Sequence, residues 1–200
     1  MRKLLLVMVC LLGIFVGRAQ AVSIGEVAPD FVLKNFEGKE VKLSDYQGKI
    51  VVLEWFNEGC PFVQKHYGSG FMQSLQEKYT KQDVVWLSVN STDSSHRDFL
   101  SPDETKEIIQ KWGIKSSQML ADADGKVGKL YGAKTTPHMF VIAADGKLSY
   151  QGAIDDNSDA GADPKTSKNY VQQAIDELRA GAVVAVKETK PYGCSVKYAS

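Results

Sequence analysis

Two short apolar runs, at residues 50–56 and 84–90, dominate the hydrophobic pattern of the chain. Each consists almost wholly of β-branched, aromatic and aliphatic side chains and is bounded by turn residues. This pattern is typical of strands that are buried on both faces of a sheet. Weaker strand patterns at 31–33 and 41–43 flank a turn at 36–39 and predict an N-terminal β-hairpin.

Apolar positions at helical spacing alternate with these strands. They predict a helix that begins at Pro61, is interrupted at 68–70 by two glycines, and resumes from 71 to 79. Ser101 and Pro102 provide a cap and a first-turn proline for a second helix, which ends at Gly113. The remaining predicted elements are strands at 118–121, 138–143 and 147–152 and helices at 127–131 and 168–179. Strand–helix–strand units followed by a hairpin and a helix predict an α/β fold with a central mixed β-sheet flanked by helices.

The first 21 residues have the features of a secretory signal peptide. Arg2 and Lys3 precede an apolar stretch at 4–17, and Ala19-Gln20-Ala21 provides a cleavage site. The stretch is shorter than the ~20 residues of a membrane span, so we expect cleavage near Ala21 and no stable membrane anchor. The exported chain would then be periplasmic or extracellular.

Length and charge narrow the possible functions. The 200 residues suit one domain, which we place at 22–182, followed by a C-terminal tail at 183–200 that carries Cys194. The 24 basic and 24 acidic residues balance, and no run rich in lysine or arginine provides a nucleic-acid footprint, so we expect no nucleic-acid partner. Cys10 would be removed with the signal peptide. Cys60 and Cys194 would then remain, in a compartment that oxidises thiols.

Cys60 lies where the first buried strand gives way to a helix. Asn57-Glu58-Gly59 ends the strand, and Pro61 suits the first helical position. Unpaired N–H groups and the positive end of the helix dipole favour the thiolate, which is the nucleophilic form of cysteine. The pattern therefore predicts a reactive Cys60 with a pKa below that of a free thiol. The alternative is an unreactive cysteine of the core.

Several segments carry a resemblance to a known family. They are the segment 55–61 around Cys60, Ala28-Pro29-Asp30-Phe31 near the start of the domain, 43–49 before the core strand, and 136–141. Together they resemble the thioredoxin superfamily, and within it the AhpC/TSA family of redoxin or peroxiredoxin-like proteins, over roughly residues 25–156. The resemblance implies a thioredoxin-like fold in which Thr136-Pro137 forms the cis-proline loop opposite Cys60. Substrate binding would then involve Pro61, Thr136, Pro137 and His138.

The chain departs from the family's active sites in two ways. A thioredoxin-type motif has a second cysteine where this chain has Val63, so Cys60 lacks a neighbouring cysteine that could resolve a mixed disulfide. Val63 also occupies the place of the peroxide-reducing cysteine of peroxiredoxins, and the region of their arginine reads Thr135-Thr136-Pro137. These differences favour disulfide chemistry and predict weak peroxidase activity.

The C-terminal tail provides a candidate for the missing cysteine. Gly193-Cys194-Ser195 is similar to the ending of a group of redoxin-like proteins with a single active-site cysteine. We therefore interpret the chain as an exported thiol–disulfide oxidoreductase or antioxidant protein, with Cys60 as the nucleophile and Cys194 as the resolving thiol. Its substrate would be a thiol or a disulfide, including one carried by a protein. No cofactor is expected, and the sequence does not identify the reductant.

Two alternatives remain open at this point. Cys60 with His66 and His138 would make a metal site, as in Sco-like copper proteins, which resemble this frame but use two cysteines and a histidine. Otherwise Cys60 and Cys194 would only staple a structural domain. The acidic run at 155–159 loosely resembles a calcium loop but lacks its glycine and its final glutamate, so we expect a solvated loop there.

Overall fold

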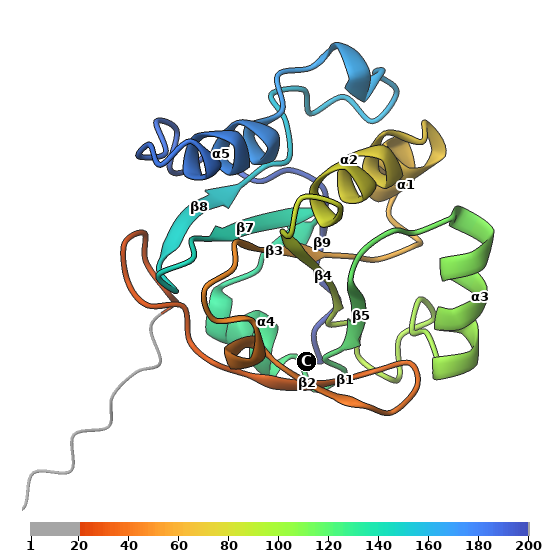
Figure 1. Cartoon of the computed structure of the whole chain (residues 1–200). Coiled ribbons are helices and arrows are strands. Elements are labelled where there is room, and N and C mark those ends of the chain that lie inside the picture. Colours follow the sequence, from red (N-terminus) through yellow and green to blue (C-terminus); the bar gives the residue numbers. More distant parts are fainter. Residues whose placement is uncertain (1–20, 200) are drawn as a thin grey trace, which may run out of the picture.

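The structure, a computed structural model, describes residues 21–199 and has an α/β architecture (Figure 1). Seven strands form one mixed sheet in the order β2-β1-β5-β4-β3-β7-β8, and a separate two-stranded sheet pairs β6 with β9. The predicted central mixed sheet and N-terminal hairpin are confirmed. Of the predicted signal peptide, residues 1–20 lie outside the described residues.

The elements follow the predicted order. The strands of the large sheet are β1 (Val32–Asn35), β2 (Glu40–Lys42), β3 (Val51–Trp55), β4 (Val85–Asn90), β5 (Gln118–Ala121), β7 (His138–Ile142) and β8 (Leu148–Gly152). The small pair consists of β6 (Thr135–Thr136) and β9 (Cys194–Ser195). The α-helices are α1 (Pro61–Gly68), α2 (Phe71–Thr80), α3 (Pro102–Trp112), α4 (Lys126–Tyr131) and α5 (Tyr170–Arg179), with 3-10 turns at Leu43–Tyr46 and Pro164–Thr166.

Strand β3 is the centre of the sheet. It pairs in parallel with β4 and antiparallel with β7, and all five of its residues are buried. Because successive side chains of a strand point to opposite faces, β3 contributes to two cores. Val52 packs into the core on one face, while Leu53 and Trp55 pack into the core on the other face.

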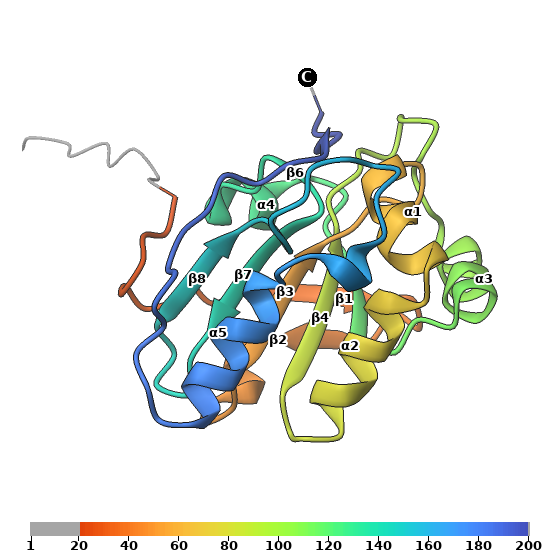
Figure 2. The same ribbon diagram turned by 90° about the horizontal axis from the view of Figure 1, so that it is seen from above.

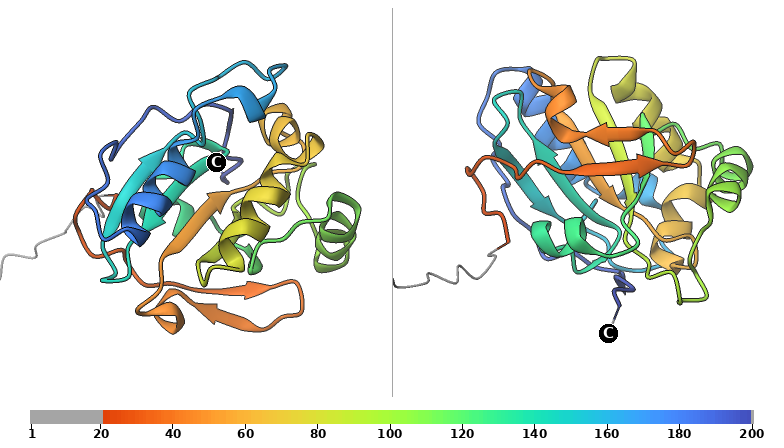
Figure 3. Two further views of the ribbon diagram at one scale, coloured as in Figure 1. Left: turned by 45° about the horizontal axis from the view of Figure 1, so that its top comes forward. Right: turned by 90° about the horizontal axis from the view of Figure 1, so that it is seen from below.

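Helices cover both faces of the sheet. Helices α1, α2 and α5 lie on one face, and α4 lies on the other (Figures 1 and 2). The β1–β2 hairpin lies on the same side as α4, where it is seen in front in the view from below (Figure 3). The sheet is thus enclosed on both sides, as the uninterrupted apolar runs of its central strands require.

The predicted helix interruption is confirmed. Helix α1 ends at Gly68 and α2 begins at Phe71, with Gly70 between them at a φ of 73°. This left-handed backbone favours glycine, which explains why the helical pattern breaks here. Helix α3 begins with a capping box, because the Ser101 hydroxyl accepts from the Glu104 N–H and the Glu104 carboxylate accepts from the Ser101 N–H.

The C-terminal segment returns across the domain. Val184 is buried, Glu188 forms a bridge with Gln151 of β8, and β9 pairs antiparallel with β6. Figure 2 shows this segment in dark blue, running along β8 toward β6. The tail therefore reaches the end of β3 at which Cys60 lies. None of the helices within residues 21–199 combines the length and apolar character that a membrane crossing needs.

Candidate functional site: two thiols at the start of α1

Cys60 is the N-cap residue of α1, and it follows the C-terminal end of β3. Its N–H donates to the Asn57 carbonyl over 3.2 Å, and its own carbonyl accepts from the Gln64 N–H, which opens the helix. Pro61 occupies the first helical position as predicted. The Cys60 side chain is only 1% exposed, and its Sγ–H donates to the Thr136 carbonyl over 2.8 Å.

The tail places the second cysteine beside the first. Cys194 in β9 pairs with Thr136 in β6, the residue whose carbonyl the Cys60 thiol contacts. The Thr136–Pro137 peptide bond is cis, as the resemblance implied. Gly193 permits this close approach, because a Cβ there would lie 2.1 Å from the Thr136 carbonyl oxygen. Cys60 and Cys194 are the cysteines among the described residues, and both are free thiols.

The surroundings of Cys60 favour its thiolate. Burial of the thiol on its own raises the pKa of Cys60, but hydrogen bonding from Cys194 and Thr136 and the N–H of Val63 together outweigh it and lower the pKa below that of an ordinary thiol. The Thr136 hydroxyl is well suited to this, because it is buried and has no hydrogen-bond partner among the described residues. A thiolate at Cys60 would supply the missing acceptor.

Cys194 behaves in the opposite way. Burial, together with the hydrogen bond and negative charge of Cys60, raises the pKa of Cys194 to about 11. The pair therefore ionises first at Cys60, and Cys194 stays protonated while Cys60 is a thiolate. Cys194 is also the more accessible sulfur, since its residue is partly exposed whereas Cys60 is buried. The arrangement can break and form disulfide bonds with distinct roles for the two sulfurs.

Comparison with known proteins agrees with this chemistry. A family model described as the AhpC/TSA family matches residues 24–151. The chain belongs to the AhpC/TSA family. A relative named thiol-disulfide oxidoreductase ResA, from Geobacillus thermodenitrificans, is 30% identical over 128 residues, which cover 64% of this chain and 68% of the relative.

Solved structures give the fold. A hypothetical protein from Sinorhizobium meliloti superposes with a TM-score of 0.78 at 22% identity, covering 90% of this chain and 97% of that one. The thioredoxin domain of a thiol-disulfide oxidoreductase from Bacteroides vulgatus has a TM-score of 0.52 at 22% identity, covering 66% of this chain and 89% of that one. The predicted thioredoxin-like fold of this AhpC/TSA chain is confirmed.

The structure does not bring the two candidate histidines to Cys60 as a metal site. The His138 ring lies 4.5 Å from the Phe140 ring, in a tilted arrangement, and its Nδ1 accepts from the Lys134 N–H. Phe140 belongs to the core on the face of the sheet opposite to the core that contains Cys60. His66 is fully buried under the tail, where its Nε2 contacts the Tyr192 hydroxyl. Within residues 21–199 no group of three or more His, Cys, Asp or Glu side chains is arranged to hold a metal ion, and Cys60, His66 and His138 do not form such a group.

Glu54 is a polar residue of the site region that the sequence analysis did not single out. It is the fourth of the five residues of β3, is fully buried, and accepts hydrogen bonds from the side chains of Tyr67, Gln76, Trp86 and Ser88. Burial raises the pKa of this carboxyl above its ordinary value despite these four donors. The signal that would have found it is one acidic residue inside an otherwise apolar seven-residue run.

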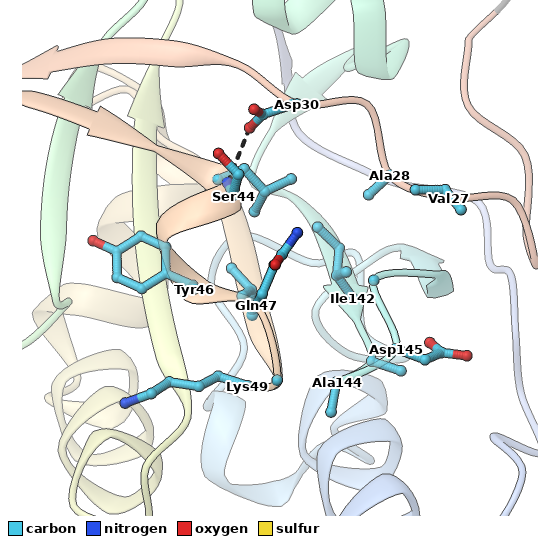
Figure 4. A pocket seen from close by; sticks show the side chains of 15 residues that line it. Val27, Ala28, Asp30, Ser44, Tyr46, Gln47, Lys49, Ile142, Ala144 and Asp145 are labelled. Atoms are coloured by element: carbon cyan, nitrogen blue, oxygen red, sulfur yellow. Dashed lines mark hydrogen bonds between the residues drawn. The ribbon is translucent and has the colours of Figure 1, made fainter.

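A separate pocket lies at the other end of β3. It has a volume of about 470 Å³ and is lined by the segment around Val27, by residues 43–51 and by the turn after β7 (Figure 4). Asp30 accepts a hydrogen bond from the Ser44 N–H at its rim. None of the residues predicted for the thiol site lines this pocket.

Proposed function

We propose that this AhpC/TSA protein is a thiol–disulfide oxidoreductase in which Cys60 is the nucleophile and Cys194 is the resolving thiol. The observation that carries the proposal is the meeting of a helix-capping cysteine of lowered pKa with the tail cysteine across the β6–β9 pair. The name of the ResA relatives supports the reaction class. The resolving cysteine comes from the far end of the chain, in place of the missing neighbour at Val63.

The reaction has two balanced steps. The Cys60 thiolate attacks one sulfur of a substrate disulfide, forms a mixed disulfide with it, and expels the other substrate sulfur as a thiolate. The negative charge on Cys60 is then gone, which removes one cause of the raised pKa of Cys194. Cys194 loses its proton to solvent and attacks the Cys60 sulfur, which releases the second substrate thiolate. The substrate disulfide gains two electrons and becomes two thiols, and the protein is oxidised to the Cys60–Cys194 disulfide.

The reverse direction uses the same atoms. A reducing thiolate attacks the Cys194 sulfur, forms a mixed disulfide with it, and expels Cys60 as a thiolate. Cys60 is the better leaving group of the two, because a thiol of lower pKa leaves faster. A second reducing thiolate then attacks the reductant sulfur of the mixed disulfide and releases Cys194, so the two reducing thiols end as a disulfide and the protein gains two electrons. The proposal requires the tail to move during the cycle, since the Cys60 sulfur is buried beneath β9.

The remaining features of the proposal rest on the sequence. We place the activity outside the cytoplasm because of the predicted signal peptide with cleavage near Ala21. The Thr136 carbonyl contacts the Cys60 sulfur, and Thr136 and Pro137 would bind the substrate beside Pro61. The buried His138 ring would contribute to substrate binding only indirectly, through its hydrogen bond to the Lys134 N–H of the loop. Peroxidase activity is expected to be weak, since no ionised cysteine stands at Val63 and no arginine at 135–137.

Trapping of the mixed disulfide tests this function. Reduced Cys194→Ser protein is mixed with a model protein disulfide, and the products are separated without reductant and mapped by mass spectrometry. We expect a stable covalent adduct on Cys60 in this variant, a Cys60–Cys194 disulfide and a reduced substrate in the wild type, and neither in Cys60→Ser. A wild-type protein that reduces no disulfide, with both of its cysteines permanently joined, would instead support a structural staple.

A further inference from the structure

Tyr192 lies two residues before Cys194 and connects the tail to the helix that begins at Cys60. Its ring lies 5.8 Å from the Phe62 ring, and the Lys65 ammonium lies 5.5 Å from its centroid. Its hydroxyl is 3.2 Å from Nε2 of His66. Phe62, Lys65 and His66 follow one another at helical spacing, so Tyr192 contacts one continuous face of α1.

The Tyr192 hydroxyl also meets a buried carboxylate. It donates a hydrogen bond to Oδ1 of Asp155, whose side chain is fully buried in the loop after β8. The expected solvated loop is therefore wrong at this position, because Asp155 turns inward. The Lys65 ammonium, also almost fully buried, lies 4.0 Å from the other Asp155 oxygen and donates to the Asn157 carbonyl over 2.7 Å. We call Tyr192, Asp155, Lys65 and His66 the Tyr192 cluster.

The buried polar atoms of the Tyr192 cluster have few hydrogen-bond partners, and they would have fewer without the tail. Asp155 Oδ2 and His66 Nδ1 already lack hydrogen-bond partners among the described residues. Burial, reinforced by the neighbouring Lys65 charge, lowers the pKa of His66 to about 3, so its ring is neutral and brings no positive charge to the carboxylate. Removal of the Tyr192 hydroxyl would leave Asp155 Oδ1 with only the Asn157 N–H. A buried carboxylate that loses a donor is costly, and the cost is relieved if the tail leaves and water enters.

We propose that Tyr192 is a positioning residue, which holds the Cys194 segment against α1 and so sets how strongly Cys194 forms a disulfide with Cys60. The inference rests on the proposed function, since it concerns the same pair of sulfurs. Gly193 is the single residue between Tyr192 and Cys194, so a displacement at Tyr192 passes directly to the sulfur. The docked tail holds the Cys194 thiol close to Cys60. The effective concentration of this thiol at Cys60 is proportional to the fraction of molecules in which the tail is docked.

The tail contains a matched control at Tyr198. Its hydroxyl donates to the Ala133 carbonyl over 2.9 Å, and the Lys129 ammonium lies 5.5 Å from its ring. Tyr198 therefore resembles Tyr192 in its contacts, except that its hydroxyl donates to a neutral carbonyl and that of Tyr192 to a buried carboxylate. Each tyrosine loses one hydroxyl when it is replaced by phenylalanine, on opposite sides of Cys194. Hydrogen bonds to charged groups contribute more than neutral ones, so the two replacements should differ.

The experiment measures the disulfide equilibrium in glutathione buffers. Wild type, Tyr192→Phe and Tyr198→Phe are equilibrated at fixed pH over a series of ratios of reduced to oxidised glutathione, quenched with acid, and the Cys60–Cys194 disulfide is quantified by mass spectrometry. We expect the equilibrium constant to fall about tenfold or more in Tyr192→Phe, which raises the reduction potential by about 30 mV per tenfold change. In Tyr198→Phe we expect a change of about threefold or less. Thermal unfolding of the reduced proteins serves as the folding control.

The outcomes separate the two proposals. Equal constants for Tyr192→Phe and Tyr198→Phe, with a disulfide that forms normally in the wild type, would overturn the positioning role and leave the proposed function intact. A wild-type protein that never forms the Cys60–Cys194 disulfide would overturn both. If Tyr192→Phe does not fold, Asp155→Asn is measured in its place. It is also expected to lower the constant about tenfold, because it removes the carboxylate charge, and an unchanged constant would count against the proposal.

Discussion

Replacement of Gly193 by alanine should uncouple the two thiols while leaving the rest of the fold in place. Gly193 has a φ of 132°, in the region that favours glycine, and lies between Tyr192 and Cys194. A Cβ at this position would lie 2.1 Å from the Thr136 carbonyl oxygen and 2.8 Å from its carbon. Both of these atoms are backbone, so neither can rotate away as a side chain would.

The size of the effect follows from what the clash would break. Ordinary van der Waals contact begins at about 3.4 Å, so the tail must retreat by more than 1 Å. The β6–β9 pair consists of two residue pairs, and the Val196 N–H adds a bond of 3.1 Å to the Lys134 carbonyl. Loss of two or three hydrogen bonds at about 1 kcal/mol each amounts to about 2 to 3 kcal/mol. The equilibrium constant for the Cys60–Cys194 disulfide should therefore fall roughly 30- to 140-fold.

The same titration against glutathione measures this constant, and Gly181→Ala provides the control. Gly181 also has a positive φ, of 72°, but an added Cβ there would meet nothing within 4 Å. Gly181→Ala therefore carries the backbone strain without the clash and should keep the wild-type constant. If Gly193→Ala and Gly181→Ala gave the same constant, the close approach at Thr136 would not be what holds Cys194 near Cys60.

Three further predictions concern other groups of the site. In a Cys194→Ser background, the rate of Cys60 alkylation should rise with pH through a midpoint below that of a free thiol, and Thr136→Val should raise that midpoint; a wild-type midpoint at the ordinary thiol value would contradict the proposed role of the site. Because burial raises the pKa of Glu54, the folded chain binds the carboxyl proton of Glu54 more tightly than the unfolded chain does. The free energy of unfolding therefore falls as the pH rises above the pKa that Glu54 has in the unfolded chain. Glu54→Gln should lessen this fall in the free energy of unfolding, measured by urea unfolding between pH 4 and 8. The same dependence on pH in Glu54→Gln and wild type would count against this explanation. Oxidation of Cys60 by micromolar hydrogen peroxide should be slow, as Val63 predicts, whereas rapid stoichiometric oxidation followed by mass spectrometry would refute this.

Local signals predicted the elements of the fold well. The break between α1 and α2 follows from the glycines at 68–70, and the start of α3 follows from Ser101 and Pro102. Both depend on backbone preferences of a few neighbouring residues, which the sequence shows directly. The position of Cys60 at a strand end and helix start was predictable for the same reason.

The sequence predicted less well the positions of side chains that depend on contacts with residues far away along the chain. His138 begins a strand in which every residue is buried, so the apolar pattern does not say which face its ring takes, and the structure turns it toward Phe140. Asp155 looks like part of a solvated acidic run, because its partners Lys65 and Tyr192 lie far away along the chain. The pairing of β9 with β6 depends on the same kind of distant contact, so the sequence could only name Cys194 as a candidate.

The central claim, that Cys60 and Cys194 form one redox pair, is tested most directly by peptide mapping without reductant. The protein is isolated from the cells that produce it, its free thiols are blocked at once, and its peptides are analysed before and after reduction. The account predicts a fraction of molecules with a disulfide between the Cys60 and Cys194 peptides of the same chain, and loss of that species after brief treatment with a mild thiol. Both thiols found free under every oxidising condition, or paired only between chains, would contradict it.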